Sequence, residues 1–170
     1  MSSKWYHQIL FFILLILLQV WFFSRIHLFN FATPLPYIYF IAKLPSNMNR
    51  NVVLLLSFLL GFFIDLFGYT MGINALASTI AGFSRYYSLQ LFTPKDLPQK
   101  YTPSVQTLGS TFFQRYIGFI LLIHEFVFFL VETFSLFDPV ILLIRFLSSF
   151  VLTFILVIVF ERFNFNFQKE

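Results

Sequence analysis

The chain has 170 residues, of which 59% are hydrophobic and only 11% are charged, and its mean hydropathy is +0.83. This balance lies outside that of soluble globular domains, so lipid must be the main solvent of the protein. The sequence contains no cysteine, which excludes a disulfide framework, thiolate chemistry and cysteine-ligated metal sites. The net charge of +4 has to be interpreted loop by loop, as orientation in a membrane.

The first two apolar runs differ in regularity. The run Ile9–Phe23 ends in bulky side chains and lacks the small residues that signal peptidase needs, so we expect it to remain as an anchor. The run Phe29–Leu44 contains Pro34 and Pro36, which predict an extended or kinked entry. We expect the helix itself to begin near Pro36, because proline suits the first turn of a helix.

The next two runs differ in polarity. The run Val52–Phe67 is apolar except for Ser57 and Asp65. The run Gly72–Phe83 contains three polar side chains and reaches spanning length only if it continues through Tyr87. This fourth segment is therefore the weakest of the predicted spans.

The last two runs, Tyr116–Phe137 and Val140–Phe160, are each long enough to cross a bilayer, and Asp138 and Pro139 form the turn between them. We predict one all-α transmembrane domain over residues 1–170, a bundle of six helices with a cytoplasmic loop at 88–115. The predicted spans are residues 5–23, 29–44, 52–67, 71–87, 116–137 and 140–160.

The basic residues predict an orientation for this bundle. With both termini in the cytoplasm, nine of the eleven basic residues fall on the inner side, Arg25 falls outside and Arg145 lies within the sixth span. This asymmetry follows the positive-inside rule. If the fourth segment did not cross, a loop with four basic residues would lie outside, so the rule favours a crossing. The continuous apolar runs exclude a β-barrel.

Within the loop 88–115, Thr102 and Pro103 fit an N-cap followed by the first helical position. Apolar residues recur from Val105 at i, i+3 and i+7. A short interfacial helix and an irregular solvated loop both fit this pattern.

Polar residues inside the spans are costly and therefore informative. Glu132 lies six residues before the outer turn at Asp138, and Arg145 lies seven residues after it. At about 1.5 Å per residue both lie about 10 Å from the turn, where they could pair. Asp65 and Asn74 could join them. Such a cluster is either a polar site that opens outward or, as we favour, an ion pair that holds helices together.

His124 and Glu125 lie near the middle of the fifth span. As neighbours they face about 100° apart on a helix, and Glu125 shares a face with Glu132. A proton relay or a metal site would use such residues, but a second well-placed histidine is missing. We favour side chains that bond to neighbouring helices.

Enzyme signatures are absent from the sequence. His124 and Glu125 do not continue into H-E-x-x-H, because residue 128 is phenylalanine, and there is no G-x-S-x-G motif and no P-loop. The basic residues are spread along the chain and form no nucleic-acid-binding patch. We expect no enzymatic activity, no metal and no cofactor.

Several stretches occur in an order and spacing that resemble the rod shape-determining MreD family over nearly the whole chain. These stretches are Gln19, Pro36–Tyr39, Leu44–Pro45, Leu60–Phe67, Gly72–Ala77, His124 and Glu132–Ser135.

The resemblance implies a non-enzymatic scaffold of the bacterial cell-elongation complex in the cytoplasmic membrane, which controls cell shape and lateral peptidoglycan synthesis. The implied partner is an MreC-like protein and, through it, MreB, RodA and the partner transpeptidase of RodA. The family fold is similar to the substrate-binding subunits of energy-coupling-factor transporters. This similarity supplies the alternative, a small-molecule capture subunit with an outward site lined by Asp65, Asn74, Glu132 and Arg145.

Overall fold

The structure is a computed structural model that describes residues 3–23, 32–70, 72–94, 96–98, 100–132 and 139–167. Every regular element within these residues is an α-helix, which confirms the predicted all-α class. The helices are α1 (Ser3–Trp21), α2 (Ile38–Lys43), α3 (Arg50–Gly68), α4 (Ile73–Phe92), α5 (Val105–Leu108), α6 (Ser110–Glu132) and α7 (Pro139–Phe167).

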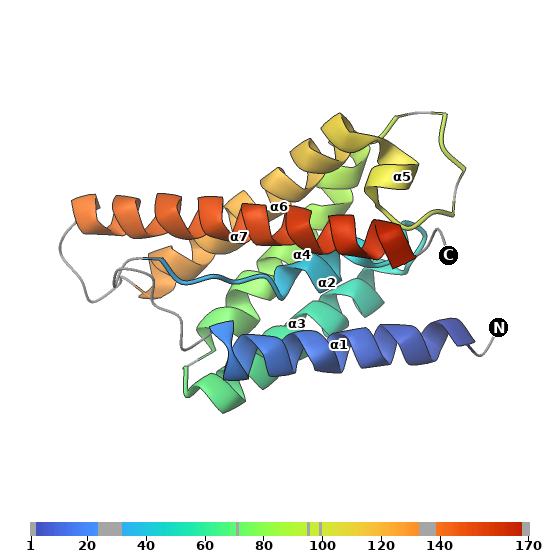
Figure 1. The fold of residues 1–170 in the computed structure, drawn as a ribbon. Coiled ribbons are helices and arrows are strands. Elements are labelled where there is room, and N and C mark those ends of the chain that lie inside the picture. Colours follow the sequence, from blue (N-terminus) through green and yellow to red (C-terminus); the bar gives the residue numbers. More distant parts are fainter. Residues whose placement is uncertain are drawn as a thin grey trace.

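The long helices form a bundle (Figure 1). Helices α1 and α3 run in the same direction, residues 32–37 and α2 run back between them, and α4, α6 and α7 then alternate in direction. Helix α4 packs against both α3 and α6, α1 lies along α3, and α7 lies along α6. Both chain ends lie at the same end of the bundle, on the right of Figure 1. The short helix α2 contacts α4 and α6 and is buried among the longer helices.

Three helices are long and apolar enough to cross a membrane, namely Arg50–Gly68, Ser110–Glu132 and Pro139–Phe163. The apolar part of α1, Ile9–Trp21, is shorter. By length and composition, these helices are consistent with a membrane protein. That the remaining segments also cross the membrane, to give six spans, stays a prediction.

Helix α7 continues to Phe167, beyond the predicted end at residue 160, and two further boundaries change the predicted loop. Helix α4 continues to Phe92, beyond the predicted end at residue 87, and α6 begins at Ser110, before the predicted start at 116. The predicted loop 88–115 therefore shortens to the connection between Phe92 and Ser110.

This connection contains the short helix α5. Its N-cap is Ser104, so the predicted cap at Thr102 was wrong. The Ser104 hydroxyl accepts from the Thr107 N–H, and the Thr107 hydroxyl accepts from the Ser104 N–H. This reciprocal capping box moves the start of the helix by two residues.

Small residues allow α3 and α4 to approach closely. A Cβ atom added at Gly61 would overlap the carbonyl oxygen of Asn74, and one added at Gly82 would overlap the Ser57 side chain. The Ser78 hydroxyl donates to the Ser57 carbonyl at 2.8 Å across the interface. Small residues four apart on both helices are typical of close helix packing in membranes.

Candidate functional site

The Asp65 carboxylate caps the first turn of α4. Its Oδ1 accepts from the backbone N–H and the side-chain amide of Asn74, at 3.1 and 2.9 Å. Its Oδ2 accepts from the Ala75 N–H at 2.8 Å, and the Thr70 hydroxyl donates to Oδ1. The N-cap residue Gly72 has no side chain, so a carboxylate from α3 satisfies the free N–H groups of α4. Asp65 therefore has a structural role here.

Tyr37 links Asn74 to the predicted site residue His124. The Tyr37 hydroxyl donates to Asn74 Oδ1 at 2.9 Å and lies 2.7 Å from His124 Nε2, and the two rings meet edge to face. A phenol has one hydrogen to donate, so His124 Nε2 must donate to the Tyr37 oxygen. The structure thus joins Tyr37, Asp65, Asn74 and His124 in one buried network.

Residues 32–37 form a non-helical segment that leads into α2, as the two prolines predicted. We call residues 32–37 the entry segment. The Thr33 N–H donates to the Ser149 hydroxyl at 2.9 Å, and the Leu35 N–H donates to the Thr153 hydroxyl at 3.1 Å. The two prolines carry no N–H group. Side chains of α7 therefore satisfy donors that irregular backbone in a membrane would otherwise leave unpaired.

The entry segment is held on its other side by α1. The buried Gln19 side chain donates to the Pro34 carbonyl at 3.1 Å. Gln19 lies in a run of apolar residues, and this contact explains a polar residue at that position. The entry segment is thereby fixed between α1 and α7.

Glu125 lies beside this segment. It is completely buried on α6 and lies next to Thr153, without a hydrogen bond of standard geometry to any described residue. The expected hydrogen bond is therefore present for His124, to Tyr37 at the start of α2, and the Glu125 carboxylate lies next to Thr153 of α7.

Glu132 and Arg145 form the ion pair that their equal depth predicted. Arg145 Nη2 lies 3.1 Å from Glu132 Oε1, and the side chains are 20% and 31% exposed, respectively. Within the described part of the chain, no hydrogen bond connects this pair to Asp65 or Asn74. The structure thus divides the predicted cluster into two groups, the buried network and a partly exposed ion pair.

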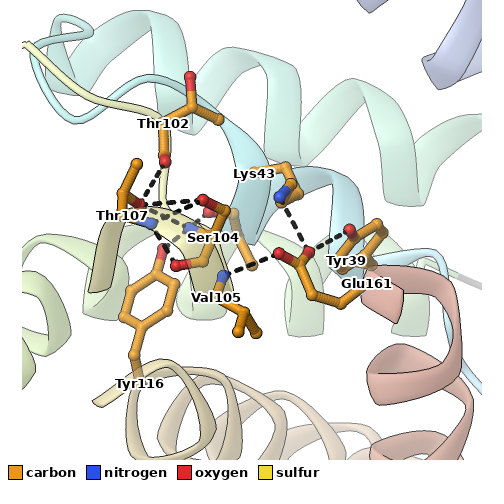
Figure 2. Close-up of polar contacts among 9 residues, drawn as sticks. Tyr39, Lys43, Thr102, Ser104, Val105, Thr107, Tyr116 and Glu161 are labelled. Carbon is orange, nitrogen blue, oxygen red and sulfur yellow. Dashed lines mark hydrogen bonds and ion pairs between the residues drawn. The ribbon is translucent and has the colours of Figure 1, made fainter. Parts of the chain in front are cut away.

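A second buried network, which the sequence analysis missed, centres on Glu161 of α7 (Figure 2). Its Oε2 accepts from the Tyr39 hydroxyl at 2.5 Å and from the Lys43 ammonium group at 2.9 Å. Its Oε1 accepts from the Val105 N–H at 2.9 Å. A single carboxylate with 3% exposure therefore joins α2, α5 and α7. Lys43 and Glu161 both lie at the inner ends of predicted spans, and that shared depth could have revealed the pair.

The free carbonyls at the end of α2 also find partners in the longer helices. Buried Arg85 of α4 donates through Nη2 to the carbonyls of Leu44 and Pro45, and the Tyr116 hydroxyl of α6 donates to the Ala42 carbonyl at 2.9 Å. A six-residue helix has few internal hydrogen bonds, so these contacts fix its position.

The hollows in the described part of the molecule include three at its surface. They lie along the exposed face of α1, beside Val105 and Arg162, and between α3 and α4 near Arg50. The predicted outward-site residues Asp65, Asn74, Glu132 and Arg145 line none of these three hollows.

Comparison with known proteins adds no assignment: no protein-family model, no curated protein and no solved structure matches this chain.

Proposed function

We propose that this protein is a non-enzymatic membrane scaffold of the bacterial cell-elongation complex, similar to MreD, that binds an MreC-like partner. One observation carries the proposal. The stretches that resemble the MreD family are far apart in the sequence, and five of them meet around the entry segment. These five contribute Gln19, Tyr37, Asp65, Asn74 and His124.

The hydrogen bonds of Asp65 and Asn74, two residues of the alternative outward site, support a scaffold over a capture subunit. A binding site keeps a few polar groups free to face its ligand. Here Asp65 accepts from Thr70, Asn74 and Ala75, and Asn74 accepts from Tyr37. These groups bond to one another, so the network ties helices together and presents few free groups to a small molecule.

The proposed topology has six crossings with both termini in the cytoplasm. Helices α1 and α4, with 19 and 20 residues, have lengths of about 28 and 30 Å at 1.5 Å per residue. The entry segment adds about 20 Å of extended chain and α2 adds about 9 Å. The lengths of α1 and α4, and the sum of about 29 Å for the entry segment with α2, are each close to the roughly 30 Å thickness of the hydrocarbon core.

The second crossing would therefore be half extended and half helical. Lipid-exposed backbone of this kind does not occur within a bilayer, but backbone enclosed by protein is tolerated. The contacts of Thr33, Pro34 and Leu35 with α1 and α7 meet that condition. The alternating directions of the elements and the shared end of both termini also fit six crossings (Figure 1).

Affinity purification tests the scaffold. A tagged chain at native abundance in a rod-shaped bacterium is extracted in mild detergent, and an unrelated six-span protein with the same tag is the control. The MreC-like protein should be enriched with the tagged chain only, followed by MreB, RodA and the transpeptidase, and depletion of the chain should round the cells. Recovery of an ATPase module and a bound small molecule without the MreC-like protein would instead support a capture subunit.

A further inference from the structure

A groove between α3 and α4 is lined by both basic and apolar residues. It lies where α3 begins and α4 approaches its end, with a volume of about 260 Å³. This is the end of the bundle that carries both termini (Figure 1). Two arginines, Arg50 and Arg85, line the groove, and its lining contains no acidic residue.

Arg85 gives this groove a fixed cation. Arg85 is only 3% exposed, and its Nη2 donates hydrogen bonds to the carbonyls of Leu44 and Pro45. Its Nε has no hydrogen-bond partner within the described residues. A buried N–H group without a partner costs free energy, so a ligand that accepts from it would be stabilised.

Arg50 supplies a second cation at the mouth of the groove. Its guanidinium lies 3.3 Å from the centre of the Tyr86 ring. Stacking on an aromatic ring holds a guanidinium in place and leaves its edge N–H groups available for anions. Both arginines are therefore positioned before any ligand arrives.

The remaining lining includes the polar residues Ser46 and Asn51 and a set of apolar residues that lie further along the helices. Val53 and Leu54 of α3 and Phe83 of α4 continue the groove away from the arginines, and Phe83 is 57% exposed. The groove is thus cationic at the end of the bundle and apolar toward its middle. A phospholipid has the matching arrangement, an anionic phosphate above acyl chains.

We propose that this groove is a binding site for an anionic phospholipid, with the headgroup phosphate at Arg50 and Arg85 and an acyl chain along Val53, Leu54 and Phe83. The site requires that this end of the bundle lies at a membrane surface, and it does not depend on the proposed partner. In detergent solution the site can be tested without knowledge of which surface is cytoplasmic. Failure of the lipid site would therefore leave the scaffold proposal standing.

Lipid retention measured by native mass spectrometry tests this site. The full chain is purified in detergent and titrated with phosphatidylglycerol, with phosphatidylcholine of the same acyl chains, or with inorganic phosphate. The change is Arg50→Gln, and the matched control is Arg115→Gln, which removes an exposed basic residue of α6 near the same end of the bundle. One basic residue near an anionic lipid surface contributes enough to change affinity about fivefold.

The expected result is preferential retention of phosphatidylglycerol by the parent chain, an affinity about fivefold lower for Arg50→Gln, and no change for Arg115→Gln. Equal retention of both lipids would overturn the proposal. Equal losses in the two variants would also overturn it, because they would indicate attraction to the basic surface as a whole. Competition by inorganic phosphate at comparable concentration would show that the groove takes a free anion and would overturn the lipid assignment.

Discussion

The Glu161 carboxylate accepts hydrogen bonds from three residues of α2 and α5, and one of them is the nearly buried Lys43 with its ammonium group. Removal of one partner of a buried ion pair leaves the other charge uncompensated. We expect Glu161→Ala to lower the free energy of unfolding by about 3 kcal/mol, measured by thermal unfolding in detergent.

The neighbouring residue supplies the control for this variant. Arg162 is exposed, and Arg162→Gln should change the free energy of unfolding by less than about 0.5 kcal/mol. Addition of Lys43→Met to Glu161→Ala should recover part of the loss, because no buried charge then remains unpaired. Equal effects of Glu161→Ala and Arg162→Gln would contradict the central position of Glu161.

The partly exposed ion pair between Glu132 and Arg145 leads to a charge-exchange prediction. Each single reversal, Glu132→Arg or Arg145→Glu, places like charges together and should cost about 1 kcal/mol. The double exchange should restore most of the folded yield, measured by size-exclusion profiles in detergent. An exchange no better than either single reversal would show that the pair does not stabilise the fold.

Counting residues from a turn was enough to predict the pairing of Glu132 with Arg145. Counting residues from the inner ends of the second and sixth predicted spans would likewise have placed Lys43 and Glu161 at the same depth. Lys43 instead contributed only to the count of basic residues that orient the chain in the membrane. The contact between Thr33 and Ser149 could not be predicted in this way, since it joins residues 116 positions apart and a serine in an apolar run gives no indication of its partner.

At the scale of elements, the contact between α3 and α4 depends on glycine. Gly61→Ala should destabilise the protein by about 1–3 kcal/mol, because its Cβ would overlap the Asn74 backbone. Gly118→Ala is the matched control: its Cβ would meet only the Phe154 ring, at 3.6 Å, and alanine favours helix. Thermal unfolding of both variants checks this, and a larger loss for Gly118→Ala would contradict the proposed packing.

The entry segment leads to a second prediction about elements. Ser149→Ala removes the acceptor of the partly buried Thr33 N–H and should cost about 1 kcal/mol of stability. Among the residues that the structure describes, the adjacent Ser148 bonds only to carbonyls of its own helix, so Ser148→Ala should be nearly neutral. Hydrogen exchange at Thr33 should also accelerate in Ser149→Ala alone. Unchanged exchange would show that α7 does not hold the segment.

The helices and the irregular segment could be predicted where a single sequence feature, such as apolar length or a proline, determines the local structure. Apolar length located α3, α6 and α7, and the prolines indicated the irregular entry to α2. The partners of that irregular backbone were not predictable, because they are side chains of α1 and α7. The cap of α5 was misplaced because a Thr-Pro pair and a capping box lie two residues apart, and the reciprocal hydrogen bonds favour Ser104.

At the scale of the whole molecule, two counts of membrane crossings compete. Length and composition identify three helices that can cross, α3, α6 and α7. Six crossings are supported by three features: the distribution of basic residues, the lengths of α1 and α4, and the enclosed entry segment. The counts differ in where they place the connection between α4 and α6.

Single-cysteine labelling distinguishes these counts directly, because the natural chain contains no cysteine. Cysteines are introduced one at a time at the exposed positions Asn47, Tyr69 and Lys100, and intact cells are treated with a membrane-impermeant maleimide. Six crossings predict labelling at residue 69 only, with residues 47 and 100 labelled after permeabilisation. Labelling of residues 69 and 100 together in intact cells would contradict six crossings, because α4 would then not cross the membrane.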